Sequence, residues 1–161
     1  MVIDCHYHLE ERMLPVTALL RQMDACGVDK TALMACLCDP FPALSPLLAG
    51  LLHSLLTRKA LRPIGRLLCA NFTPAGEIKV LGKAYRIYPD PDNAAVFRTI
   101  AEHPDRFLGW VFVNPHGKND PVKELERWKD HPGCVGVKAH PFWHRYAPAD
   151  LIPVAERVTA L

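Results

Sequence analysis

The chain has 161 residues, half of them hydrophobic and 22% charged, with a formal net charge of +2. This composition excludes a disordered tail and supplies enough apolar residues for a core. The near-neutral charge, without a basic or acidic block, argues against nucleic acid or a membrane surface as a partner. The most apolar stretch, residues 43–56, is shorter than the roughly 20 residues of a membrane span.

The first third of the sequence predicts a strand, a helix and a second strand. Residues 2–5 form a short β-type run, and residues 30–37 form an apolar run typical of a strand buried on both faces. Between them, Pro15 opens a helix that Gly27 ends. The apolar residues of this helix recur at helical spacing: Val16, Leu19, Leu20, Met23 and Cys26.

An irregular segment follows, at about residues 39–89. Residues 47–56 predict a helix, and residues 78–88 fit a short strand, a hairpin or a loop. The segment lies after a strand, where loops form the catalytic face of a (β/α)8 barrel, so a substrate lid and a structural excursion both remain open. Its aromatic residues favour an organic substrate over a sugar: Phe41, Phe72, Tyr85 and Tyr88.

The second half of the sequence returns to regular alternation. Residues 106–114 and 134–139 predict strands, and helices are expected to begin near Asp92, Asp120 and Pro148. The residues expected to face the core from these helices are Ala94, Phe97, Ile100, Ala101, Val122, Leu125, Trp128, Leu151, Val154, Ala155, Val158 and Leu161.

Strands that alternate with amphipathic helices indicate parallel βα units. Four units are visible, whereas a closed barrel needs eight and typically roughly 250 residues. We therefore predict an α/β fold, the first half of a (β/α)8 TIM barrel. It forms one partial domain over residues 1–161, with the insert at about residues 39–89. A small open α/β sheet is the alternative.

The sharpest motif lies at the end of the first predicted strand, where Asp4, His6 and His8 alternate with other residues. Alternate residues share a face of a strand, so all three are expected to point the same way. Two imidazoles about 7 Å apart along a strand can converge on one metal ion. Asp4 would then orient a ligand from behind. Two surface histidines on an edge strand are the alternative.

Three stretches together resemble the amidohydrolase-related superfamily of metal-dependent TIM-barrel hydrolases. The first is Val2-Ile3-Asp4-Cys5-His6-Tyr7-His8. The second runs from Asp92-Asn93 through Glu102-His103-Pro104-Asp105-Arg106-Phe107 to Val113-Asn114-Pro115, and the third is Gly136-Val137-Lys138-Ala139-His140-Pro141. They occur in the same order in that family and span the chain apart from the insert.

The resemblance implies a divalent metal, most often zinc, held by His6 and His8 with a further histidine from the fifth strand and an aspartate from the eighth. It implies a metal-activated water that hydrolyses a small organic substrate. Some relatives instead perform non-oxidative decarboxylation. The fifth-strand histidine and the eighth-strand aspartate, which is the general base, have no counterpart here and are expected beyond residue 161. No catalytic residue is therefore assigned.

Other polar residues near predicted strand ends are candidates for substrate binding. Lys138 and His140 share a strand face and suit an anionic group, and a structural hydrogen bond is the other possibility. The resemblance also implies a weaker alternative, a carboxylated Lys138 that bridges two ions as in binuclear relatives. Asn114, His116 and His144 are further candidates, although a turn beside Pro115 is the safer interpretation of Asn114 and His116. The remaining histidines and cysteines are interpreted as structural: His53, His103, His131, Cys36 and Cys38.

A second hypothesis comes from a different class of function. A half-barrel lacking its later ligands would be inactive and would assemble with a second copy or with a missing C-terminal half, which would cover its open sheet edges. In either case the partners expected are a small-molecule substrate or another protein chain. The six cysteines in apolar runs and the absence of a visible secretory signal favour a cytoplasmic location.

Overall fold

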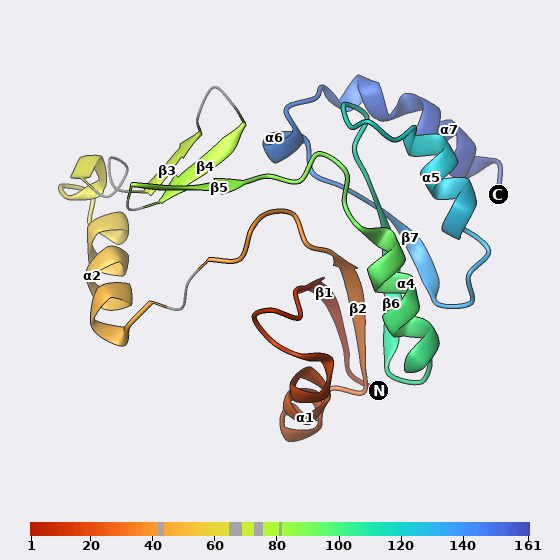
Figure 1. Ribbon diagram of the computed structural model, residues 1–161, viewed down its shortest axis with the longest axis horizontal. Coiled ribbons are helices and arrows are strands. Elements are labelled where there is room, and N and C mark those ends of the chain that lie inside the picture. The colour runs from red at the N-terminus through yellow and green to blue at the C-terminus, as the bar shows by residue number, and fades with distance from the viewer. Residues whose placement is uncertain (42–43, 65–68, 73–75, 81) are drawn as a thin grey trace. The chain divides into compact units, whose positions relative to one another are not determined.

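The computed structural model describes residues 1–41, 44–64, 69–72, 76–80 and 82–161, which divide into two compact units (Figure 1). Unit 1 comprises Met1–Leu37 and Tyr88–Leu161, and unit 2 comprises Cys38–Ile87. Unit 2 is the segment that the sequence sets apart as an insert. Each unit is described by itself below.

Unit 1 is built on a four-stranded parallel sheet. Its strands are β1 (Ile3–Leu9), β2 (Lys30–Ala35), β6 (Phe107–Val113) and β7 (Cys134–Ala139), and they lie side by side in this order. The order in the sheet follows the order in the chain, with a helix after each strand. The predicted α/β class with parallel βα units is confirmed.

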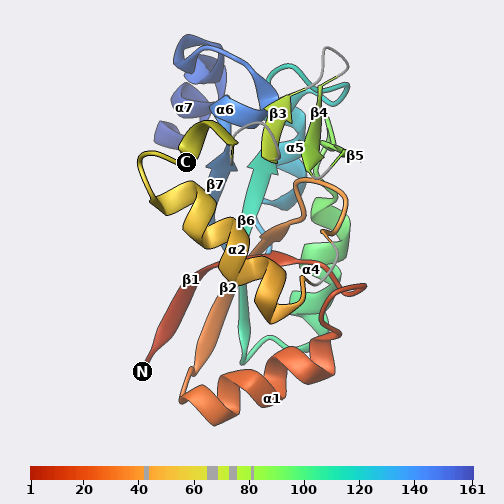
Figure 2. The same ribbon diagram turned by 90° about the vertical axis from the view of Figure 1, so that its left-hand side faces the viewer.

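Helices cover one face of this sheet, and the core lies beneath them. They are α1 (Val16–Cys26), α4 (Asn93–Glu102), α5 (Pro121–Trp128) and α7 (Ile152–Thr159). Figures 1 and 2 show α4, α5 and α7 on the same side of β6 and β7. The most deeply buried core residues on this side are Leu33, Val96, Phe97, Ile100, Phe107, Val111 and Val113.

Local signals in the sequence fix the helix ends. Gly27 ends α1 with a φ of 67°, a left-handed conformation that glycine adopts without a Cβ penalty. The carboxylates of Asp92 and Asp120 cap α4 and α5 by accepting hydrogen bonds from backbone N–H groups of the first turn. These helix starts agree with the sequence prediction.

The predicted helix after Pro148 is split in two. Residues Pro148–Leu151 form a 3-10 turn, η1, and α7 begins at Ile152. Pro153 has no N–H to continue the first segment, which explains the break. Some residues that the sequence predicts to face the core are exposed instead. They are Cys26 of α1, Ala101 of α4, Ala155 and Val158 of α7, and Leu161 after α7.

Strand β1 is longer than predicted and contains a bulge. Asp4 pairs with Thr31 but Tyr7 pairs with Leu33, so β1 has one extra residue between these two positions. A bulge interrupts the alternation of side chains between the two faces of a strand. This irregularity decides which residues of the opening motif lie together.

Unit 2 contains α2 (Pro46–Thr57) and an antiparallel sheet of β3 (Cys69–Phe72), β4 (Glu77–Val80) and β5 (Lys83–Arg86). The hairpin of β4 and β5 resolves the three options left open for residues 78–88. Tyr85 is buried and its ring packs against Phe41, with centroids 4.7 Å apart. The side chain of Phe72 lies outside the described residues.

No helix among the described residues combines the length and apolar character that a membrane crossing requires.

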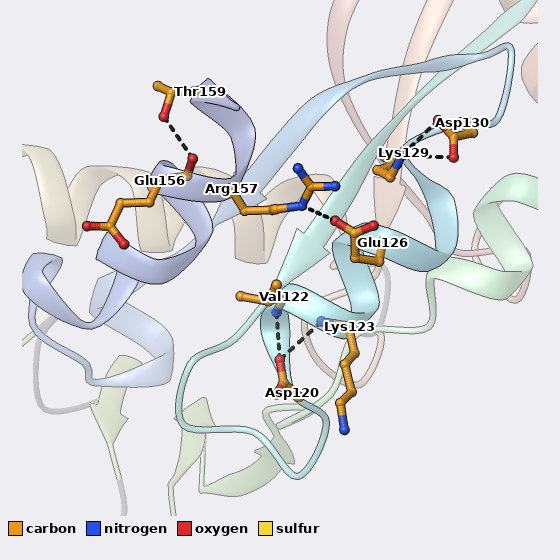
Figure 3. Close-up of polar contacts among 9 residues, drawn as sticks. All are labelled: Asp120, Val122, Lys123, Glu126, Lys129, Asp130, Glu156, Arg157 and Thr159. Carbon is orange, nitrogen blue, oxygen red and sulfur yellow. Dashed lines mark hydrogen bonds and ion pairs between the residues drawn. The ribbon is translucent and has the colours of Figure 1, made fainter. Parts of the chain in front are cut away.

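Figure 3 shows polar contacts of helices α5 and α7, one of which joins the two helices. Arg157 of α7 donates a hydrogen bond from Nε to the Glu126 carboxylate of α5. At the start of α5, Asp120 accepts from Val122 N at 2.8 Å and from Lys123 N at 3.1 Å. The cap therefore satisfies two N–H groups that have no partner within the helix.

Replacing Asp120 by alanine removes both cap bonds, so we expect the free energy of unfolding to fall by about 1 kcal/mol, measured by urea denaturation. The matched control is Asp130→Ala. Asp130 lies near the end of the same helix, is 85% exposed and pairs with Lys129, so its loss should change stability by less than about 0.5 kcal/mol. Equal losses in the two variants would contradict the capping role.

Candidate functional site

The face of the unit 1 sheet opposite the helices carries most of the candidate residues. Register places His8 beside Met34 and Phe112 beside Lys138. Side chains alternate between the two faces of a strand, so His8, Met34, Phe112 and Lys138 project from the face opposite to Leu9, Ala35, Val111 and Val113, although Phe112 is itself buried and contacts the core cluster. We call this the open face.

Trp110 spans the open face. Its indole Nε1 donates to the carbonyl oxygen of Cys5 at 3.2 Å, although β2 lies between β6 and β1. On its other side the ring lies against Gly136, where an added Cβ would come within 3.0 Å of it. Gly136 also has a φ of 149°, so a larger residue is disfavoured twice. A single side chain thus connects three strands across the open face.

His6 and His8 converge on the open face. Their ring centroids are 5.2 Å apart and the rings meet edge to face. The Nδ1 of His8 lies 2.8 Å from the carbonyl oxygen of Ala35 in the next strand. Because a carbonyl only accepts, His8 carries its proton on Nδ1, and Nε2 keeps a free lone pair. The expected pairing of the two imidazoles is therefore present in the structure.

Asp4 does not share the face of His8. Its partner Thr31 belongs to the same side of β2 as Leu33, which is the helix-covered side. The carboxylate accepts a hydrogen bond from the backbone N of His6 at 3.0 Å. The prediction that all three residues point the same way is wrong for Asp4 and His8, because the bulge adds one residue to β1 between Asp4 and Tyr7.

Burial and charge keep His8 neutral. Desolvation lowers the pKa of His8 most, the bond to Ala35 opposes this, and the nearby charges of His6, Lys138 and His140 lower it further. Burial and the Lys138 ammonium likewise lower the pKa of His140. Neutral imidazoles are the form that binds a metal.

Lys138 and His140 lie at the carboxyl end of β7 and approach the histidines of β1. The two strands are the outer members of the sheet, yet the charge of His6 on β1 contributes to the lowered pKa of His140 on β7. His140 accepts a hydrogen bond at Nδ1 from Trp143 N, 3.3 Å away, at the start of the short helix α6 (Pro141–His144). Its Nε2 therefore carries the proton and is a donor.

The other two substrate-binding candidates are held by backbone groups. Asn114 is buried, donates from Nδ2 to the Pro89 carbonyl at 2.7 Å and accepts from His116 N at 3.0 Å. This is the turn role that the sequence left as its alternative. His144 is only 8% exposed, and its Nε2 bonds to the Tyr88 carbonyl at 3.1 Å, while its buried Nδ1 has no partner among the described residues.

A cluster directly after β1 escaped the sequence analysis. Arg12 donates from Nε and a terminal nitrogen to the two carboxylate oxygens of Glu10, and also to the Tyr88 hydroxyl at 3.0 Å. The ion pair with Arg12 lowers the pKa of Glu10. The sequence signal for this ion pair is the spacing of Glu10 and Arg12, which directly follow β1. Nothing in the neighbouring sequence indicated that the Tyr88 hydroxyl would bond to Arg12.

The residues on the open face fit part of a metal site. His8 has the usual arrangement of a metal-bound histidine, with one ring nitrogen donating to a carbonyl and the other available. His6 stands next to it. However, no group of three or more histidine, cysteine, aspartate or glutamate side chains among the described residues is arranged to hold an ion. Within the described residues the open face thus brings together two imidazoles, fewer than the three or four ligands that zinc takes from proteins.

A match to a protein-family model shows which family the chain belongs to. The family model for amidohydrolases matches residues 66–160, more than half of the chain. The chain belongs to the amidohydrolase family. The matched segment contains β6, β7, Lys138 and His140 but begins after β1, so it does not include His6 and His8. No curated protein and no solved structure matches the chain.

Buried neutral histidines make stability depend on pH. Burial lowers the pKa of His144, His140 and His8 in the folded protein, whereas in the unfolded chain each titrates near 6.5. Below about pH 6.5 the unfolded state therefore binds more protons than the folded state. We expect the free energy of unfolding to fall as the pH drops from 7 to about 5.5, measured by urea denaturation.

Replacing His144 by glutamine removes one of these groups and should weaken the pH dependence. His53→Gln is the control, because His53 is exposed and lies in unit 2. A dependence in His144→Gln as steep as in the wild-type protein would contradict the contribution of His144.

Proposed function

We propose that this amidohydrolase-family chain contributes to metal-dependent hydrolysis of a small organic substrate, with His6 and His8 as metal ligands. The observation that carries the proposal is the hydrogen bond between His8 Nδ1 and the Ala35 carbonyl. It leaves Nε2 of a neutral ring available beside a second imidazole 5.2 Å away. Membership of the family supports the hydrolytic class of reaction.

A bound zinc ion would supply a water of lowered pKa as the nucleophile. The chain's own residues supply binding and orientation. Lys138 and the Nε2–H of His140 are donors whose charges act on His8, and they suit an anionic or carbonyl group of the substrate. Asn114 is left out of this set, because backbone groups occupy its amide. His144 is left out as well, because its Nε2 bonds to the Tyr88 carbonyl and its ring packs against Phe112, with centroids 5.7 Å apart.

We also propose that the sheet of unit 1 is the first half of a (β/α)8 barrel. Trp110 crosses β2 to reach the backbone of β1, and residues on the two outer strands influence each other electrostatically. In a flat sheet, strands three positions apart would lie about 14 Å from one another. A sheet curved towards its open face brings such groups closer, as in a barrel. Sequential parallel order supports the same arrangement.

A second candidate function is an inactive half-barrel that assembles with a second copy or with a C-terminal half. The observation that favours it is the two-histidine donor set, because no third ligand joins His6 and His8 within the described residues. Non-oxidative decarboxylation is the other reaction compatible with the same site. In all three cases the proposed location is the cytoplasm, where thiols such as Cys5, Cys26 and Cys134 remain reduced.

The metal proposal is tested by replacing His6 and His8 together with alanine. We expect the wild-type protein to bind about one Zn²⁺ per chain and the double variant to lose most of this binding, because both imidazole ligands are gone. Elemental analysis after dialysis against Zn²⁺ measures the content. His53→Ala combined with His103→Ala is the matched control, since it removes two histidines that lie elsewhere in the chain.

Unchanged zinc content in the His6 and His8 variant would exclude these residues as ligands. A wild-type protein that binds zinc but neither hydrolyses esters, lactones and amides nor releases CO2 from aromatic acids would favour the inactive half-barrel. Sedimentation of the same sample then distinguishes a monomer from a pair of chains.

A further inference from the structure

A buried asparagine takes the place of a strand partner on β6. The pairing of β2 with β6 extends from Thr31–Phe107 to Leu33–Gly109. Gly109 donates towards β7, to the Gly133 carbonyl, so three residues later the backbone of Phe112 faces β2. There, Asn93 of α4 accepts from Phe112 N at 2.8 Å and donates from Nδ2 to Phe112 O at 2.9 Å. Its amide satisfies both backbone groups of this residue.

A second layer fixes the orientation of that amide. Nδ2 of Asn93 also donates to Glu124 Oε1 on α5 at 3.0 Å, and the same oxygen accepts from Trp128 Nε1 at 2.8 Å. Asn93 is 1% exposed and its two bonds to the Phe112 backbone are buried, while the two bonds to Glu124 are partly buried. The amide nitrogen of Asn93 faces two acceptors and its oxygen faces a donor, so a flipped amide would lose these hydrogen bonds. Asn93 therefore has a single orientation.

The residue held in this way separates two histidines on the open face. The ring of Phe112 is fully buried, with its centroid 6.2 Å from that of His8 and 5.7 Å from that of His144. Both distances fall within the range of interacting aromatic rings. A shift of the Phe112 backbone would therefore move the surface on which the His8 ring rests.

From these contacts we propose that Asn93 is a positioning residue, which holds Phe112 so that the His8 ring keeps its hydrogen bond to Ala35 and directs Nε2 into the open face. The expected effect of Asn93 on metal affinity rests on the proposed function. The expected effect on the hydrogen bond of the His8 ring does not. The two parts are measured separately.

The test compares wild-type protein with Asn93→Ala, using the full chain at one pH near 7.5. In the metal-free state, long-range ¹⁵N–¹H spectra report which nitrogen of His8 carries the proton. We expect a single Nδ1-protonated form in the wild-type protein and a mixture of tautomers in the variant. Competition with a chromophoric chelator should show about a tenfold weaker Zn²⁺ affinity in the variant.

Thr99→Val is the matched control. Thr99 is a buried polar residue of the same helix, and its hydroxyl bonds to the Ala95 carbonyl within that helix rather than to β6. We expect His8 spectra and zinc affinity within twofold of wild type. Phe112→Leu should reproduce the effects of Asn93→Ala, and the double variant should be no worse than either single one, because both act through the same ring.

A purely structural role predicts a different result: Asn93→Ala lowers the urea midpoint but leaves the His8 tautomer and zinc affinity unchanged, which would overturn the proposal. If wild-type protein binds no zinc, the proposed function fails, and the tautomer measurement alone decides the role of Asn93. If Asn93→Ala does not fold, Phe112→Leu decides, and unaltered His8 spectra in that variant would refute the inference.

Discussion

The hydrogen bond between His8 Nδ1 and the carbonyl of Ala35 determines what the open face can do. A histidine ring has two nitrogens, and only the one without a proton can bind a cation. By fixing the proton on Nδ1, the bond to β2 leaves Nε2 of the neutral ring without a proton. The same bond ties the proposed metal ligand of β1 to the adjacent strand.

The two faces of the unit 1 sheet differ in the side chains that they carry. Helices α1, α4, α5 and α7 bury the apolar side, with Leu33, Phe97 and Val111 at its centre. The other side carries imidazoles, a lysine and Trp110, whose contacts run across the strands. Asn93 links the two sides, because its helix belongs to the core while its amide holds a residue of the open face.

Family membership and site geometry support each other without overlapping. The amidohydrolase match covers residues 66–160, whereas the histidine pair lies in β1. The match therefore supports the class of reaction and the strands that carry Lys138 and His140. The proposed ligand role of His6 and His8 rests on the geometry of the two rings, which lie outside the matched segment.

The sequence alone determined the order of elements in unit 1, since proline, aspartate and glycine signals mark helix ends locally and apolar runs mark buried strands. It also singled out His6 and His8, because their spacing is a property of the chain. Only the tertiary structure decided that Asp4 faces away, that Asn114 supports a turn, and that Asn93 is buried. Each of these outcomes depends on residues far apart in the chain. Asp4 depends on the bulge of β1 against β2, Asn114 on the Pro89 carbonyl 25 residues away, and Asn93 on the end of the β2–β6 pairing. No pattern of neighbouring residues encodes such contacts.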